Sequence, residues 1–253
     1  METLAKLIRN SRNFVVFTGA GMSTESGIPD FRSPGGLWSR WNPPMFQEFM
    51  AKAEARNYYW RFYREMFKDL VKAKPNEGHL ALGRLFAAGR LKAVVTQNVD
   101  GLHQAGGVDP EAVVELHGAT ALTTCLGCGR HRENTQDVLK RIQGQEKADP
   151  ACPLCGGPLK PATISFGQSL DGAVLTRAVD LCRGADLLLV VGSSLVVQPA
   201  AGLPLLTLQS GGRLAVINRE PTPMDHLAAM VAHASAGPIL SSAADIVLKD
   251  AIN

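Results

Sequence analysis

The sequence predicts an α/β fold: a Rossmann-like, doubly wound parallel sheet with a smaller domain that is partly helical and partly zinc-binding. Short apolar runs that end in polar or glycine residues, with helical patterns between them, predict the large domain. Two Cys-x-x-Cys pairs in a segment poor in apolar residues predict the small one. With 253 residues, 45% of them hydrophobic, the chain is long enough for both.

Four runs are typical of parallel strands that are buried on both faces. They are NFVVFTGAG (13–21), LKAVVTQNVD (91–100), ADLLLVVGSS (185–194) and GGRLAVINRE (211–220). AVVELHG (112–118) and ADIVLKD (244–250) are weaker candidates for the same sheet. Because ligands of open α/β sheets bind beyond the carboxyl ends of the strands, the polar residues there are expected to face one crevice.

Three segments have the apolar spacing of helices. Residues 1–13 combine this spacing with charged residues, which favours a surface helix over an export signal. The helix within 76–91 is expected to end near Gly89, and the helix within 171–186 to begin with Asp171 as its N-cap.

Two segments interrupt the alternation of strands and helices. Residues 31–74 are rich in aromatic residues and helical in pattern, and residues 120–161 hold both cysteine pairs. We expect these insertions to form the small domain together. Residues 1–30, 75–119 and 162–253 then form the Rossmann-like domain.

Four of the five cysteines have the spacing of a tetrahedral zinc site: Cys125, Cys128, Cys152 and Cys155. Gly129, Gly156 and Gly157 follow the pairs, where such knuckles need a positive φ. Four thiolates leave no coordination position for water, so the zinc is expected to be structural. Cys182 lies on the apolar face of a predicted helix and is expected to be a plain buried thiol.

The overall charge and hydropathy exclude two classes of partner. A formal net charge of +3 with 19% charged residues argues against a protein that binds nucleic acid directly. No apolar run reaches the length of a membrane span, so no membrane partner is expected. Cysteines in metal-ligand spacing indicate a reducing compartment, and we expect a cytoplasmic protein.

A glycine-rich loop, GAGMSTESGIPDFR, follows the first predicted strand. Gly19, Ala20 and Gly21 allow a close turn, and Ser23 and Thr24 offer hydrogen-bond donors, as in a phosphate-binding loop. The motif is not the usual G-x-G-x-x-G. By itself it is equally compatible with a tight turn.

Polar clusters also follow the other predicted strands. They are Gln97, Asn98 and Asp100 after the second, Gly192, Ser193 and Ser194 after the third, and Asn218 and Glu220 after the fourth. Each cluster alone is compatible with a capped turn or a loop. Their repeated placement at strand ends predicts one shared site. His103 is expected to lie outside the chemistry, because its spacing does not single it out.

Taken together, these residues resemble the sirtuin family, the NAD-dependent protein lysine deacylases. The matching landmarks run in family order through nearly the whole chain: GAGMSTESGIPDFR, TQNVDGLH, ELHG, the cysteine pairs, ISFG, GSSLVVQPA and INRE. The resemblance implies NAD as cofactor, with acylated lysine-containing proteins or peptides as substrates. It implies deacylated lysine, nicotinamide and an O-acyl-ADP-ribose as products.

The resemblance also implies roles for individual residues. The cofactor-binding residues are Gly19, Ala20, Gly21, Thr24, Phe31, Arg32, Gln97, Asn98, Val99, Asp100, Gly192, Ser193, Ser194, Asn218, Glu220 and Ile246. The substrate peptide is expected to add as a strand between Phe166 and Gly167 on one side and Val196 and Val197 on the other.

His117 has three readings: a zinc ligand, a buried core histidine or a catalytic base. The four thiolates make it unnecessary as a ligand, and an isolated histidine after an apolar run would be assigned to the core. The surrounding landmarks favour the general base, which takes a proton from a ribose hydroxyl and is typically worth about 10²–10⁴-fold in rate. Asn98 is expected to assist by ordering the ribose or a water.

The acyl group is the least determined feature. Relatives that remove succinyl or malonyl groups carry Tyr-x-x-Arg in the helical insertion. Ungapped counting places Tyr63 and Met66 at these positions, without a cation, whereas another register offers Tyr58 and Arg61. We expect acetyl or another uncharged acyl group. The alternatives are a deacylase for a longer or acidic acyl group, and a mono-ADP-ribosyltransferase that uses the same NAD site.

Overall fold

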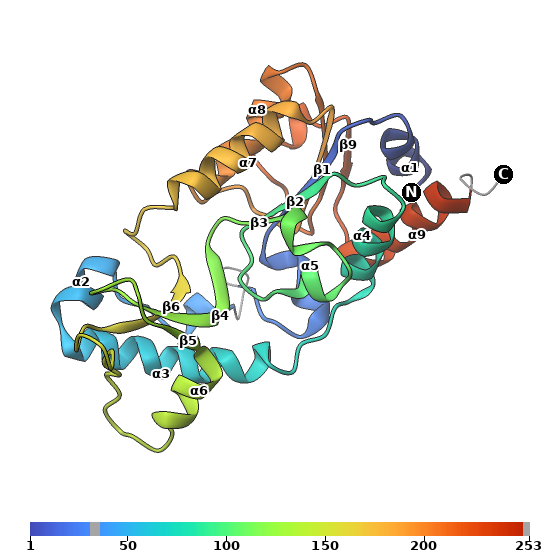
Figure 1. Cartoon of the computed structure of the whole chain (residues 1–253). Coiled ribbons are helices and arrows are strands. Elements are labelled where there is room, and N and C mark those ends of the chain that lie inside the picture. Colours follow the sequence, from blue (N-terminus) through green and yellow to red (C-terminus); the bar gives the residue numbers. More distant parts are fainter. Residues whose placement is uncertain (31–35, 250–253) are drawn as a thin grey trace.

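The computed structural model describes residues 1–30 and 36–249, and its larger part is built on a six-stranded parallel sheet with the order β3-β2-β1-β7-β8-β9 (Figure 1). The strands are β1 (Phe14–Thr18), β2 (Ala93–Thr96), β3 (Val113–Glu115), β7 (Leu187–Val191), β8 (Arg213–Ile217) and β9 (Met230–Ala232). The predicted doubly wound, Rossmann-like architecture is confirmed. All four strong strand predictions are confirmed, as is the weaker one at 112–118.

The strand order reverses between β1 and β7, so the crevice for a ligand should open at that point. Thr18, the last residue of β1, lies level with Thr96 of β2 and Val191 of β7. The loops that follow these strands therefore leave the sheet side by side.

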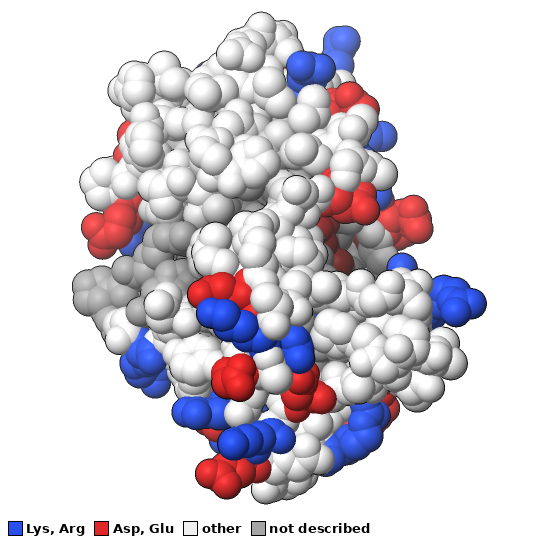
Figure 2. Space-filling model, turned by 90° about the vertical axis from the view of Figure 1, so that its left-hand side faces the viewer, with Lys and Arg blue, Asp and Glu red and all other residues white. Residues whose placement is uncertain are grey.

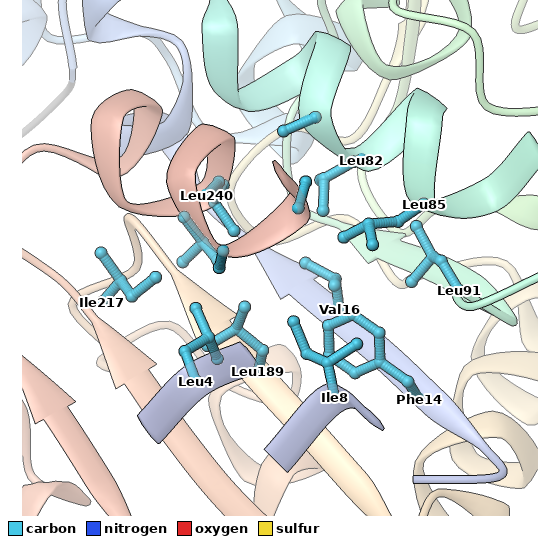
Figure 3. Close-up of a cluster of buried hydrophobic side chains, with 14 of the residues drawn as sticks. Leu4, Ile8, Phe14, Val16, Leu82, Leu85, Leu91, Leu189, Ile217 and Leu240 are labelled. Atoms are coloured by element: carbon cyan, nitrogen blue, oxygen red, sulfur yellow. The ribbon is translucent and has the colours of Figure 1, made fainter. Parts of the chain in front are cut away.

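Helices cover both faces of the sheet. One face packs against α1 (Glu2–Arg9), α4 (Glu77–Ala87) and α9 (Ala236–Lys249), and the other against α7 (Gly172–Gly184) and α8 (Leu203–Gln209). In Figure 3, leucines of α1, α4 and α9 converge on Phe14 and Val16 of β1. Burial on both faces explains why the strands are nearly continuously apolar.

The helix ends follow the predicted chemistry. Asn76 caps α4 by accepting hydrogen bonds from the backbone N–H groups of Gly78 and His79, and Gly89 beyond its end has a φ of 67°. Asp171 caps α7 by accepting from the backbone N–H groups of Ala173 and Val174. A short helix, α5 (Leu102–Ala105), follows β2.

The predicted strand at 244–250 is wrong, because its described residues belong to α9. Leu240, Ala244 and Val247 recur at helical spacing and are buried against α1, α4 and the sheet. The sixth strand is instead β9, three residues that carry too short an apolar run to be recognised in the sequence.

The smaller part of the molecule combines the two insertions. It contains α2 (Phe46–Ala51), α3 (Ala53–Leu70), α6 (Thr135–Arg141) and an antiparallel sheet, β5-β4-β6, formed by β5 (Arg132–Asn134), β4 (Gly118–Cys125) and β6 (Leu159–Thr163) (Figure 1). Trp60 and Tyr63 of α3 share one hydrophobic cluster with Val138 and Leu159. This shared core supports the predicted domain boundaries, which we propose as the organisation of the chain.

Charged side chains of both signs are interspersed over the lower half of the face shown in Figure 2. Two arginines of the smaller part are paired with carboxylates: Arg56 binds both carboxylate oxygens of Asp149, and Arg141 those of Glu133. None of the helices in the described part of the chain is both long and apolar enough to span a membrane.

Candidate active site

A cavity of about 1110 Å³ lies at the carboxyl ends of the central strands and extends to α3. Its size is slightly above the usual range of about 300–1,000 Å³ for small-molecule and cofactor sites. Most of the predicted site residues line it: Gly19, Ala20, Gly21, Thr24, Gln97, Asn98, Val99, Asp100, His117, Phe166, Gly167, Gly192, Ser193, Ser194, Val197, Asn218 and Glu220. The structure thus brings residues from distant parts of the sequence to one crevice.

Glycines let the loops after β1 and β7 touch. The backbone N–H of Gly21 donates to the carbonyl of Gly192 at 2.8 Å, and a Cβ on Gly21 would lie 2.7 Å from the Cα of Gly192. Gly192 has a φ of 62°, and its Cβ would lie 2.2 Å from the backbone nitrogen of Met22. Side chains are therefore excluded by the contact between the two loops, rather than by the turn of the first loop alone.

Asn98 is held by a buried hydrogen-bond chain. Its Nδ2 donates to Oγ of Ser23 at 3.1 Å, and that hydroxyl donates to Oδ2 of Asp100 at 2.7 Å. Ser23 lies between the short 3-10 helices η1 (Ala20–Met22) and η2 (Thr24–Ser26) and is buried. The sequence suggested Ser23 only as a donor near a phosphate. Its place in this chain depends on contacts 75 residues away, which no local pattern reveals.

His117 is oriented by the backbone of Gln97. Its Nδ1 lies 3.0 Å from the carbonyl oxygen of Gln97, and because a carbonyl only accepts, Nδ1 carries the proton. In the neutral ring the lone pair is then on Nε2. Gln97 also donates from Nε2 to Oγ of Ser193 at 2.9 Å, which ties the loop after β2 to the loop after β7.

The turn at Gly118 sets the position of His117 from the other side. Gly118 has a φ of 74° and starts β4, and the backbone N–H of Ile164 donates to the carbonyl of His117 at 2.8 Å. A Cβ at position 118 would lie 1.9 Å from the carbonyl oxygen of Ala162. Only glycine fits this position.

The four predicted ligand cysteines form one cluster, with all sulfur atoms within 4.8 Å of one another. Sγ of Cys125 lies 3.5 Å from that of Cys155, and Sγ of Cys128 lies 4.0 Å from that of Cys152. Sulfurs around a tetrahedral zinc with bonds of ~2.3 Å are about 3.8 Å apart, so the cluster fits zinc.

Glycines shape the two knuckles in different ways. Gly129 and Gly156 have φ values of 66° and 71°, as predicted. The expectation of a positive φ at Gly157 is wrong. A Cβ there would make tight contacts instead, 3.1 Å from the Cα of Gly127 and 3.3 Å from Sγ of Cys155.

Only one of the two registers considered for the helical insertion faces the cavity. Tyr63 and Met66 line the cavity, whereas Tyr58 and Arg61 do not. Asp69 lines it one turn further along the helix. Arg219 is the only lysine or arginine among the described lining residues, and it belongs to the loop after β8.

Lys160 lies nearby but does not line the cavity. It is buried in β6, where Nζ donates to the carbonyls of Pro161 and Thr163 and lies 5.4 Å from the ring centre of Tyr59. Burial without a carboxylate partner lowers its pKa to about 7.

Comparison with known proteins decides the family. The model of the Sir2 family matches residues 19–199. The chain belongs to the Sir2 family. An NAD-dependent protein deacetylase of Rhodopseudomonas palustris is 46% identical over 240 residues, 95% of this chain and 94% of the relative. An NAD-dependent protein deacylase 2 of Pyrobaculum aerophilum is 40% identical over 94% of this chain and 92% of its own length.

Solved Sir2 structures share the whole fold. A structure of Sir2 with a p53 peptide and NAD⁺ has a TM-score of 0.88 at 35% identity and covers 100% of this chain and 99% of its own. A variant of a Sir2 homologue in complex with ADP-ribose has a TM-score of 0.90 at 35% identity, over 100% and 98%.

In this Sir2-family chain, the residues that line the cavity near the end of β8 differ from those expected from the sequence. Ile246 does not line the cavity, because it lies in α9 and packs against the core of the sheet. Residues 234–236, which lead into α9 and include its first residue, line it instead. Arg219 also lines it, and its Nη2 donates to Oγ of Ser235 at 3.1 Å. No sequence pattern indicates these residues, because they follow the short strand β9.

In the predicted peptide-binding segments, some of the backbone carbonyls already accept hydrogen bonds from other residues of the chain. The carbonyls of Phe166 and Gly167 accept hydrogen bonds from the backbone N–H of Phe46 and from Nε2 of Gln47, and the carbonyl of Val197 accepts from Ala201. Val196, next in the chain to Val197, does not line the cavity but is 55% exposed.

Four other residues named in the sequence analysis lie away from the cavity or outside the described part of the chain. Phe31 and Arg32 are outside the described residues. His103 is buried and does not line the cavity. Cys182 does not line it either, and burial raises the pKa of its thiol to about 12, as expected of an inert buried cysteine.

Proposed function

We propose that the protein is an NAD-dependent protein lysine deacetylase, which transfers the acyl group of an acyl-lysine to ADP-ribose with release of nicotinamide. One observation carries the proposal: the cavity brings a histidine with its lone pair on Nε2 together with the Asn98–Ser23–Asp100 chain at the switch point of the sheet. Relatives named NAD-dependent protein deacetylase, and a Sir2 structure with NAD⁺ and a peptide, support it.

The cavity fits a dinucleotide. It spans the loops after β1, β2, β7 and β8, with hydroxyl and amide groups of Ser193, Ser194 and Asn218 toward β8 and of Gln97 and Asn98 toward β2. The first group would hold the adenosine half and the second the nicotinamide and its ribose. When bound, NAD supplies nicotinamide as the leaving group and ADP-ribose as the acceptor of the acyl group.

His117 acts as the general base, and Asn98 as a positioning residue that would order the ribose or a water. The hydrogen bond from Nδ1 to the Gln97 carbonyl keeps Nε2 ready to take a hydroxyl proton and stabilises the imidazolium that forms. Gly118 holds this ring in place by its close approach to β6.

The preferred acyl group is acetyl or another uncharged group. A succinyl or malonyl carboxylate needs a cation, and the α3 wall offers Met66 and Asp69 instead. Lys160 does not supply this cation, because its Nζ donates to the carbonyls of Pro161 and Thr163. The acidic Asp69 would repel an acidic acyl chain.

The protein substrate binds in an extended conformation, between residues 166–167 on one side and residues 196–197 on the other. Some backbone carbonyls there already accept hydrogen bonds within the chain, so the substrate forms its main-chain hydrogen bonds with other backbone groups of these segments. The exposed side chains of Phe166 and Val196 supply apolar contacts. Zinc held by the four cysteines would be structural, since four thiolates would leave no coordination position for water or substrate. Four reduced metal-ligand thiols favour the cytoplasm as the site of action.

The test is to incubate the purified protein with an acetyl-lysine peptide, with and without NAD, and to measure deacetylated peptide and nicotinamide. Both products should appear in equal amounts and only with NAD. His117→Ala should lose about 10²–10⁴-fold in rate, whereas His226→Ala, on an exposed residue, should match the parent. Label from NAD that ends on protein, rather than on a small acyl-ADP-ribose, would instead identify an ADP-ribosyltransferase.

A further inference from the structure

Two buried histidines have ring nitrogens that lack hydrogen-bond partners. His79 lies in the first turn of α4 and His103 in α5, and both are at most 1% exposed. Among the described residues, Nε2 of His79 and Nδ1 of His103 have no partner. Leaving such atoms unsatisfied in a protein interior is costly, so the pair calls for an explanation. The ring centres are 5.0 Å apart.

The neighbours of His79 determine which nitrogen carries its proton. The backbone N–H of Asn76 donates to Nδ1 of His79 at 3.3 Å, so Nδ1 is an acceptor. In the neutral ring the proton is then on Nε2. The unsatisfied nitrogen of His79 is therefore a donor.

The neighbours of His103 lead to the opposite result for its unsatisfied nitrogen. The hydroxyl of Thr18 donates to Oγ1 of Thr96 at 2.7 Å, so toward His103 it can only accept. Nε2 of His103, 2.8 Å from Oγ1 of Thr18, is the donor in that contact. Its Nδ1 is therefore an acceptor without a donor.

We propose that Nε2–H of His79 donates to Nδ1 of His103 after a small rotation of the rings, because the two atoms lie outside hydrogen-bond geometry in this structure. The two rings then form one directed hydrogen-bond chain that positions the nicotinamide side of the site. Two imidazoles joined by one N–H···N bond have ring centres roughly 5 Å apart, which matches the separation here. Burial lowers the pKa of His103 to about 3 and that of His79 to about 4, so both rings are neutral, as the chain requires.

The chain links two walls of the cavity. At one end Asn76 donates from Nδ2 to the carbonyl of Met22 and to Oγ of Ser26, which holds the loop containing η1 and η2. At the other end Oγ1 of Thr96 accepts the backbone N–H of Asn98 at 3.0 Å. Neither histidine lines the cavity, so both act as positioning residues, through Asn98 and the cofactor loop.

The direct test is ¹⁵N NMR of the unaltered protein with labelled histidine. Both rings should appear as the neutral tautomer with the proton on Nε2 from pH 7 to pH 5, with a coupling between Nε2 of His79 and Nδ1 of His103. A proton on Nδ1 of either ring, or a charged ring at pH 6, would overturn the proposal. This readout does not depend on activity, so it stands or falls separately from the proposed deacetylase function, on which the kinetic test rests.

The kinetic test compares His79→Asn, His103→Phe and the double variant. Asparagine at 79 keeps an acceptor for the Asn76 N–H but is too short to donate to His103. Each single variant should raise KM for NAD several-fold and leave KM for the peptide unchanged, and the double variant should be no worse than the poorer single one. Effects that multiply, or that fall equally on both KM values, would show that the histidines act separately or only through general stability.

Discussion

Replacing Gly118 with alanine should inactivate the enzyme by moving His117. The new Cβ would lie 1.9 Å from the carbonyl oxygen of Ala162, and relief to an ordinary contact of ~3.2 Å requires β4 and β6 to separate by about 1.3 Å at this point. Because a misplacement of about 1 Å can cost 10²-fold in rate, kcat should fall by about 100-fold. The left-handed φ of 74° adds about 1–2 kcal/mol of destabilisation.

Gly89→Ala is the matched control. Gly89 has a similar φ of 67°, but no atom lies within 4 Å of the place that a Cβ would take, so the substitution carries the backbone cost without the collision. The assay is kcat at saturating NAD and acetyl-lysine peptide, with zinc content measured for both variants. In a His117→Ala background, Gly118→Ala should slow the reaction no further. A Gly118→Ala enzyme with the parent kcat would refute this account of how His117 is held.

Three further outcomes are expected. Met66→Arg should raise kcat/KM for succinyl-lysine peptide at least tenfold. It is best combined with Asp69→Ala, which prevents an i,i+3 ion pair between the new arginine and Asp69. If kcat/KM does not rise, the acyl chain does not reach α3. Cys128→Ser should lose the metal and lower the Tm, as shown by metal analysis and calorimetry, whereas full metal content would contradict four-thiolate ligation. The free energy of unfolding should fall as the pH drops below about 6.5, because His79 and His103 have lowered folded-state pKa values and charge more readily in the unfolded chain. Urea titrations at pH 7 and pH 5 should show a loss of up to about 1.4 kcal/mol per pH unit for each histidine. A free energy of unfolding that does not change with pH would contradict their burial as neutral rings.

The elements that the sequence predicted well are those with a local physical signature. Buried parallel strands are continuously apolar and end in polar residues, so β1, β2, β7 and β8 were recognisable from composition alone. Each Cys-x-x-Cys pair is likewise a local pattern of four residues, and the two pairs together indicate a zinc site. By contrast, residues 244–249 were misassigned because a short apolar run does not distinguish a strand from a buried helix, and packing against α1 and α4 decided the outcome.

Contacts between distant segments account for the rest. The glycine at 192 is required by the backbone of Met22, and Ser23 is required by Asn98, yet neither relation leaves a pattern in the sequence. The spacing of His103 matches no motif. Only the structure places it against Thr18 and His79, the contacts on which its proposed positioning role rests.

Strand β4 begins directly after His117 and ends at Cys125, a ligand of the zinc cluster. Its eight residues, which include an irregularity between Gly118 and Thr123, would span at most roughly 26 Å if fully extended and join the cysteine cluster to His117. An oxidant that converts these thiolates into a disulfide would release the ion, loosen the far end of this strand and slow turnover without touching the reaction centre. A metal site with no chemistry of its own would then make turnover depend on the redox state of the surroundings.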